Sequence, residues 1–402
     1  MKQLNHSHSQ SIISLATVGV LASFWLSPVT FILTPAVNSL ANYYADVPYS
    51  QVLMLSTVVA LMVVPFSLIS GAVVGTKVRY RTMMLFSAAL ILAGGVAPWF
   101  FPERFSLVMA CRVAVGIGMG LSYPLCNALI IRLYPGPGQG RMQGISMVVM
   151  NVSGMLYQSF SGLVCAYDVR AMWLVHGLVA IPLVLMFRFL KEPEQESPAP
   201  IEETAPPEKS FMSMRVVAIS LGCCVLYVLI NTIIINVSTV LAFRNLGDSA
   251  TAGMVASTYA VGGLLSGVLY DQLYRRLGRW LFPFCMALYV VGAACCCYGG
   301  SVAAMVVSEL CIGFATYITW PACSRDFAPM ASADKQPLAN GILSALWNLG
   351  VFFSAPYISA VARITGDASP IMAVTVTLWL TVALGVVWTI ARLRRPAKYE
   401  QA

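Results

Sequence analysis

The sequence has little charge: only 10% of its 402 residues are Asp, Glu, Lys or Arg, against about 25% in an ordinary soluble domain. Hydrophobic residues make up 58% of the chain. This composition excludes a soluble globular protein. A helix crosses the hydrocarbon core of a bilayer with about 20 residues, so twelve crossings need about 240, which the chain can supply. The sequence therefore predicts an all-α integral membrane protein.

Residues that support metal binding or catalysis are also scarce. The chain has only 3 His, and two of them, His6 and His8, lie in its polar N-terminal segment. The 11 Cys lie almost wholly in apolar runs and lack the spacing of metal ligands, which is typical of Cys packed as a small hydrophobic residue. Neither an HExxH nor a Walker sequence is present. We therefore expect no enzyme activity, no metal and no cofactor.

Polar breaks divide the chain into twelve apolar runs, each long enough for one membrane-spanning helix. The runs lie near residues 12–40, 50–75, 82–101, 105–131, 141–166, 171–190, 213–242, 250–274, 280–299, 302–324, 337–362 and 370–391. The first run is far longer than the hydrophobic region of a secretory signal, so we expect it to be retained as the first span.

The distribution of basic residues predicts the orientation of the spans. With a cytoplasmic N-terminus, 19 of the 24 Lys and Arg fall on the cytoplasmic side, four on the outer side, and Arg112 within a span. This bias follows the positive-inside rule. We therefore expect both termini in the cytoplasm. The short outer loops favour a bacterial inner membrane. The net charge of +8 is attributed to this topology and not to a nucleic-acid partner.

The segment KEPEQESPAPIEETAPPEK, residues 191–209, is rich in Pro and Glu and has no apolar period, which is typical of a disordered or loosely helical tether. It predicts three parts of the chain. Residues 1–190 form an N-terminal six-helix bundle, 191–212 a cytoplasmic linker, and 213–402 a C-terminal six-helix bundle.

An internal repeat relates the two predicted bundles at an offset of 197 residues. The offset pairs Arg112 with Glu309, Gly116 with Gly313, Tyr123 with Trp320, Pro124 with Pro321, Cys126 with Cys323, Gln143 with Asn340, Gly144 with Gly341, Ile145 with Ile342 and Asn151 with Asn348. Two separate segments keep this one offset. We therefore expect parallel repeats, related by an axis along the membrane normal, with a substrate site between them.

Three motifs resemble those of the major facilitator superfamily, and the resemblance covers essentially the whole chain. The fourth span contains RVAVGIGMG, residues 112–120, and the loops after the second and eighth spans combine Gly with basic residues. The resemblance implies two six-helix bundles around a central cavity that opens alternately to each side of the membrane. The chain departs from the family pattern in three places. Gly75 stands where the family has Asp, and the loop after the eighth span is four residues longer than the family pattern between Asp271 and Gly278. In the fifth span, Gln158 and Ser159 replace an exporter Gly-Pro pair.

The two loops supply candidates for a cytoplasmic gate. The candidates are Gly71, Arg79, Gly267, Asp271, Arg275, Arg276 and Arg279. Small Gly residues allow helices to approach closely, and an Asp can accept bonds from basic residues or helix termini and so stabilise one conformation. The alternative is that these basic residues only satisfy the positive-inside rule.

Arg112 and Glu309 are the two ionisable residues that lie well inside apolar spans. Each is about seven residues from the outer end of its span, roughly 10 Å deep at 1.5 Å per residue. We expect them to face each other across the cavity, with Glu309 taking up a proton and Arg112 tuning it or binding an anion. The alternative is a static ion pair. His176, in the sixth span, is expected to be a packing residue more than a proton relay.

Polar and aromatic residues of the spans are candidates for the substrate cavity. They are Tyr123, Asn127, Asn151, Asn231, Trp320, Trp347 and Asn348. Tyr123 and Trp320 each precede a Pro at repeat-equivalent positions, which suits a bent helix that presents a ring to a cavity. The alternative for all of them is packing or hydrogen bonding between helices.

Together these features predict a monomeric secondary transporter that moves a small organic solute by alternating access in the lipid bilayer, with proton-coupled efflux as the leading mechanism. Three alternatives remain open. The protein could be a nutrient or organic-anion importer in which Arg112 binds a carboxylate, a uniporter, or a membrane sensor that does not transport.

Overall fold

The structure is a computed structural model that describes residues 15–134, 137–193, 214–327 and 336–393. Almost all of these residues are helical, and they contain no β-strand. The predicted all-α fold is confirmed.

The first half of the chain runs from α1 to α7, with 3-10 helices marked η. Its elements are α1 (Leu15–Phe24), η1 (Ser27–Ala36), α2 (Val37–Tyr43), α3 (Tyr49–Val73), α4 (Tyr80–Val96), η2 (Ala97–Phe100), α5 (Phe105–Leu133), α6 (Pro137–Tyr167), η3 (Ala171–Val179) and α7 (Ala180–Phe189). The first three elements form one span that bends by 42° where η1 begins. Pro28 and Pro35 of η1 lack the backbone N–H that a regular α-helix requires.

The second half runs from α8 to α13. Its elements are α8 (Met214–Phe243), α9 (Ser249–Leu277), η4 (Gly278–Trp280), α10 (Leu281–Tyr298), α11 (Val302–Phe327), α12 (Gln336–Thr365) and α13 (Pro370–Leu393). Helices α9 and α10 are joined directly by η4. Gly278 at this junction has φ +47°, a backbone conformation that glycine adopts readily and other residues rarely do.

Within the described residues, ten segments are long and apolar enough to cross a membrane, or eleven if the bent first span is included. One of these segments, Ser249–Tyr298, is 50 residues long and contains both α9 and α10. Because these two helices are separated by the turn at Gly278, each is a span of its own. The twelve spans expected from the sequence are therefore present.

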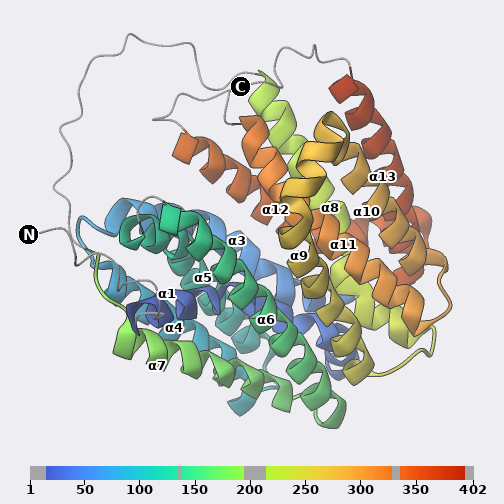
Figure 1. Ribbon diagram of the computed structural model, residues 1–402. Helices are drawn as coiled ribbons and strands as arrows, with labels where there is room; N and C mark the ends of the chain where they lie inside the picture. Colours follow the sequence, from blue (N-terminus) through green and yellow to red (C-terminus); the bar gives the residue numbers. More distant parts are fainter. Residues whose placement is uncertain (1–14, 135–136, 194–213, 328–335, 394–402) are drawn as a thin grey trace, which may run out of the picture.

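The helices pack into two groups, drawn in Figure 1 in blue to green and in yellow-green to red. One hydrophobic core extends from Val20 to Leu190 and the other from Ile219 to Leu378. Most of the predicted linker lies in 194–213, outside the described residues, so the predicted boundaries of the three parts stay a prediction.

The two ends of the molecule differ in charge. We call the end at which α3 leads into α4 and at which α7 ends the basic end, because Lys77, Arg79, Arg81 and Arg188 lie there. The other end, where α2 leads into α3 and α8 into α9, is the opposite end.

The internal repeat extends to the contacts between helices. A Cβ at Gly116 of α5 would lie 2.7 Å from Met62 Cβ of α3, and a Cβ at Gly313 of α11 would lie 2.0 Å from Tyr259 O of α9. Met62 and Tyr259 are themselves 197 residues apart. The α3–α5 and α9–α11 crossings therefore use equivalent positions, and both depend on a residue without a side chain.

The close contact at Gly313 predicts a loss of stability on substitution. Gly313→Ala should lower the free energy of unfolding by about 1–3 kcal/mol, because the added methyl group would overlap the backbone of α9. Thermal unfolding of the purified protein measures the effect.

Gly144→Ala in α6 is the matched control, because a Cβ there would meet nothing within 4 Å. This variant should be as stable as the wild type or slightly more stable, since Ala is favoured over Gly in a helix by roughly 0.5–1 kcal/mol. Equal stability of the two variants would contradict the packing described for α9 and α11.

Candidate transport site

The two halves come closest near the opposite end, where α6 crosses α9. A Cβ at Gly162 would lie 2.4 Å from Ser249 O and 2.8 Å from Gly253 Cα. A Cβ at Gly253 would lie 2.7 Å from Gln158 O. Only glycine fits at both positions, so the two backbones are in direct contact, as at other membrane interfaces built from small residues.

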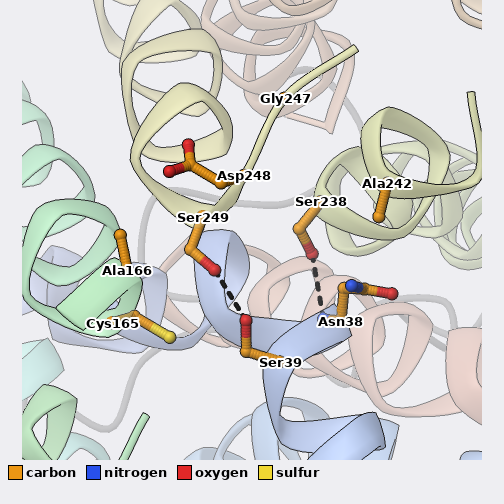
Figure 2. A pocket seen from close by; sticks show the side chains of 9 residues that line it. All are labelled: Asn38, Ser39, Cys165, Ala166, Ser238, Ala242, Gly247, Asp248 and Ser249. Carbon is orange, nitrogen blue, oxygen red and sulfur yellow. Dashed lines mark hydrogen bonds between the residues drawn. The ribbon is translucent and has the colours of Figure 1, made fainter. Parts of the chain in front are cut away.

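Hydrogen bonds also join the halves at this end (Figure 2). The hydroxyls of Ser39 and Ser249 lie 2.7 Å apart, and the backbone N–H of Asn38 donates to Ser238 Oγ at 3.3 Å. These residues border a cavity of about 220 Å³ between α2, α6, α8 and α9. Nearby, the Tyr49 hydroxyl donates to Asn236 Oδ1 at 3.0 Å. Each of these bonds crosses from the first half to the second.

A small apolar cluster completes the closure of the opposite end. Val37 and Leu53 of the first half pack there against Ile235, Ala355 and Ile358 of the second half. All five side chains are buried. The opposite end is therefore sealed by backbone contact, hydrogen bonds and apolar packing together.

Two carboxylates in the loops of the opposite end have pKa values below the usual range of an aspartate. Asp168 accepts a hydrogen bond from the backbone N–H of Arg170 at 2.8 Å, and this bond is the largest cause of its lowered pKa. Asp248 accepts one from the backbone N–H of Thr251 at 3.0 Å, which lowers its pKa and begins α9. Both groups are accordingly ionised at neutral pH.

The basic end lacks such closure within the described residues. The hydrogen bonds between the two halves all involve residues of the opposite end. A Cβ at Gly71, Gly144 or Gly267 would meet nothing within 4 Å. Helices α6 and α9 are thus in backbone contact at Gly162 and Gly253 but have no such contact at Gly144 and Gly267.

Aromatic side chains gather between the halves, midway between the two ends, and we call this group the aromatic cluster. Its members are Phe31, Tyr123, Tyr227, Tyr259, Tyr317, Trp320 and Trp347. Ring centroids are 3.6 Å apart for Tyr227 and Trp347 and 5.1 Å apart for Trp320 and Trp347. The first half contributes Phe31, whose ring centroid lies 5.6 Å from that of Tyr259, and Tyr123 of α5. Tyr123 is 38% exposed although it lies in the middle of α5, so the cluster borders an accessible space.

Asn151 of α6 supplies a polar group at the aromatic cluster. Its Nδ2 donates to Met147 O of the same helix at 2.8 Å, whereas its Oδ1 is buried and has no partner. A Cβ at Gly263 of α9 would lie 2.5 Å from this Oδ1 and 2.7 Å from the Tyr317 ring. Asn151 therefore presents a free acceptor between the halves.

The structure brings together four of the predicted cavity residues: Tyr123, Asn151, Trp320 and Trp347. Asn231 instead donates to Ser354 Oγ at 2.8 Å and so links α8 to α12 within the second half. Asn348 bonds to Ser344 O of its own helix at 2.9 Å, and Asn127 is exposed on α5. Asn231 therefore makes a hydrogen bond between helices, which was the alternative to a position in the substrate cavity.

Sequence reasoning missed four members of the aromatic cluster: Phe31, Tyr227, Tyr259 and Tyr317. One signal was available for Tyr317, because it precedes Trp320 by three residues and therefore lies on the same face of α11. The other three lie in spans for which the apolar pattern does not show which side of the helix faces the other half.

Arg112 is fully buried inside the first half, where two of its three guanidinium nitrogens have a partner and Nη2 has none. Its Nε donates to Leu55 O of α3 at 2.8 Å, and its Nη1 lies 3.1 Å from His176 Nε2. The Nδ1 of His176 lies 3.2 Å from Trp173 O. A carbonyl oxygen only accepts, so the proton is on Nδ1 and Nε2 accepts from Arg112. His176 is thus a neutral partner of Arg112, which agrees with the packing role expected for it.

Glu309 is fully buried in α11 of the second half, and both of its carboxyl oxygens lack a hydrogen-bond partner. Its helix packs against α10, where Ser308 Oγ donates to Gly292 O at 2.7 Å. The guanidinium of Arg244 donates to the carbonyls of Cys297 and Gly299. Glu309 is therefore buried in α11 without a bonded partner.

Arg112 and Glu309 form no ion pair with each other in the described residues, and their expected positions across a cavity stay a prediction. The bonded partners of Arg112 belong to the first half, and the only ion pair in the described residues joins Arg170 to Asp168 at 3.3 Å. The repeat relates the two residues in sequence, but Arg112 is bonded within its own half and Glu309 has no bonded partner. A static pair between them is not formed.

The predicted gate residues lie at the basic end. Arg79 directly precedes α4, and Asp271, Arg275 and Arg276 are exposed near the end of α9. Within the described residues no hydrogen bond or ion pair of Asp271 is found, and its role as a latch stays a prediction.

A family model described as the Major Facilitator Superfamily matches residues 13–243 and again 219–402, so that each half is matched once. The chain belongs to this superfamily. It is therefore a multi-pass membrane transporter of small molecules and not an enzyme. A search of curated proteins finds no match to the chain.

Solved structures of transporters share the fold. A variant of the nucleoside transporter NupG has a TM-score of 0.76 at 12% identity, with 94% of this chain and 100% of that one covered. The D-xylose-proton symporter has a TM-score of 0.66 at 16% identity, covering 94% and 96%. The human organic anion transporter MFSD10 has a TM-score of 0.65 at 15% identity, covering 93% and 98%. At these identities the likeness extends to the fold.

The sealed opposite end predicts a specific cross-link. In a background with Cys165→Ala, the pair Ser39→Cys and Ser249→Cys should form a disulfide on mild oxidation, because the two hydroxyl oxygens that the sulfurs replace lie 2.7 Å apart. Cys165 is removed because it lines the same cavity. Mass spectrometry of the peptides measures the cross-link.

The matched control pairs Ser39→Cys with Ser257→Cys, which lies about two turns further along α9 and is partly exposed. It should remain reduced. A cross-link that forms equally in both pairs, or in neither, would contradict the closure at Ser39 and Ser249.

Proposed function

We propose that this transporter exchanges an uncharged, ring-containing organic solute for a proton, with the proton carried by Glu309. The observation that carries the proposal is the environment of Glu309, whose two carboxyl oxygens are buried without any partner. An unpaired carboxylate in such a place is costly, so the carboxyl group is expected to hold a proton in this conformation. A conformation that opens α10 and α11 to water would allow the proton to leave.

The aromatic cluster supports the choice of solute. Its members offer flat faces and hydroxyl groups, and Asn151 offers an acceptor, but none of them carries a charge. Aromatic faces suit a solute with a ring, and a few hydrogen-bonding groups orient it. Arg112 is bonded to Leu55 and His176, which disfavours the alternative in which it binds a carboxylate from the cavity.

The orientation follows from the positive-inside bias, which places the basic end in the cytoplasm. On this proposal the conformation described above is open to the cytoplasm and closed to the outside. We further propose that the protein acts as a monomer in a bacterial inner membrane, and that the solute leaves the cell as the proton enters.

Uptake of the solute together with a proton is the second candidate. The similarity to the D-xylose-proton symporter and to the nucleoside transporter NupG favours it, since both names refer to uncharged ring-containing solutes. The sign of the coupling separates the two candidates. An imposed inward proton gradient drives the solute out by exchange and in by symport.

A substitution at Glu309 tests the coupling. A thermal-shift screen of nucleosides and pentoses first identifies a ligand, because binding to the folded state raises the apparent stability. In reconstituted vesicles Glu309→Gln should then abolish accumulation driven by a proton gradient, since the amide cannot exchange a proton. Exchange of labelled for unlabelled solute without a gradient should continue.

Glu103→Gln is the control for this test, because Glu103 is exposed at the opposite end. It should retain gradient-driven accumulation. Full accumulation by Glu309→Gln would refute coupling through this residue. A loss of exchange along with accumulation would show that Glu309 supports the fold or the solute site instead.

A further inference from the structure

A second cavity, of about 520 Å³, lies outside the transport site at the basic end. It is bordered by the start of α1, the start of α4 and the end of α7. Helix α1 is pressed against the end of α7 here, because a Cβ at Gly19 would lie 2.5 Å from the backbone nitrogen of Leu190. The cavity is therefore a built feature of the first half, on the side away from the aromatic cluster.

The cavity is strongly positive. Arg81, Arg188 and Lys191 line it, together with a single carboxylate, Glu192. Both oxygens of Glu192 are already engaged, since they accept the backbone N–H groups of Tyr80 at 2.7 Å and Arg81 at 2.8 Å. Three cations thus line a cavity whose one carboxylate is hydrogen-bonded to the start of α4.

One cation has an unused donor in the cavity wall. The Nη2 of Arg81 donates to Phe187 O at 2.5 Å, but its Nε is buried and has no partner. A buried donor without a partner costs free energy. An anion in the cavity would supply acceptors for the guanidinium groups and the ammonium group together.

Apolar side chains surround these charges. Leu15 is 66% exposed, and Phe187, over whose ring the Arg81 guanidinium lies at 5.8 Å, is 64% exposed. The Arg188 guanidinium lies 5.6 Å from the centroid of Phe189. Because α4 begins and α7 ends here, the cavity lies at the level where helices leave the hydrocarbon core, with charged groups directly beside lipid-facing ones.

We propose that this cavity binds the phosphate headgroup of an anionic phospholipid. The phosphate lies among Arg81, Arg188 and Lys191, and the acyl chains extend along Leu15 and Phe187. Free inorganic phosphate also carries negative charge, but it has no acyl chain that could pack against the exposed apolar side chains at the rim. The binding is independent of the transported solute and stabilises the packing of α1, α4 and α7.

Lipid-dependent stability tests this proposal in the full chain. Purified protein in a neutral detergent is titrated with cardiolipin, with phosphatidylcholine or with inorganic phosphate, and the unfolding temperature is measured. The double variant Arg188→Gln with Lys191→Gln removes two cations that make no hydrogen bond to the start of α4. Its apparent affinity for cardiolipin should fall about thirtyfold, since each basic residue near an anionic surface contributes about fivefold.

The matched control is Lys77→Gln with Arg141→Gln, which removes two exposed basic residues of the same end that do not line the cavity. It should retain the wild-type response to cardiolipin. Equal losses in both double variants would reduce the effect to general surface charge and overturn the proposal. An equal response of the wild type to inorganic phosphate, or to phosphatidylcholine, would overturn the assignment to an anionic lipid.

Discussion

Insertion of a charged side chain at the centre of a membrane helix costs about 2.5–3.5 kcal/mol on insertion scales, and contacts in the rest of the structure have to offset this free energy. In the first half, the backbone carbonyl of Leu55 and the neutral imidazole of His176 accept hydrogen bonds from Arg112 and offset part of this free energy. The room for that imidazole comes from Gly95, where a Cβ would lie 2.3 Å from His176 Cδ2. The second half supplies no such partners to Glu309. The repeat-equivalent positions thus carry a cation with two bonded nitrogens in one half and a carboxyl group without any partner in the other.

This difference gives the two halves different roles. Arg112 binds three helical elements of the first half together and is a fixed part of its core. On the proposed function, Glu309 changes between a neutral and a charged form, and the charged form becomes stable only when its surroundings change. Contacts between the halves are concentrated at Gly162, Gly253 and the hydroxyls of Ser39 and Ser249, so a rocking motion that breaks them leaves both cores intact.

The sequence was sufficient to predict the twelve spans and the repeat, because apolar length and a constant offset of 197 residues are properties that lipid and helix geometry impose on the chain. The same offset predicted the equal depth of Arg112 and Glu309. It could not predict which way each side chain points, because that depends on the rotation of α5 and α11 against their neighbours. Gly95 and His176 decide it in the first half.

The transport site was predicted in part for a similar reason. Tyr123 and Trp320 were found through the Pro that follows each of them, and both helices do continue through that Pro. Tyr227 and Tyr259 have no such marker. Their position depends on close approaches such as that of Gly313 to Tyr259, which apolar spacing does not reveal. Asn231 had the same polar signal as Asn151 but uses it to bind Ser354.

Distances between the halves at the two ends test the central claim, that sealing one end opens the other. Spin labels are placed in α6 and α9 at Gly144 and Gly267, and at the opposite end at Asp46 and Arg363, in a background without reactive Cys. Addition of a transported solute at low pH should shorten distances across the basic end and lengthen those across the opposite end in the same molecules. If both sets of distances stay fixed, or both change in the same direction, the two ends do not alternate and the account is wrong.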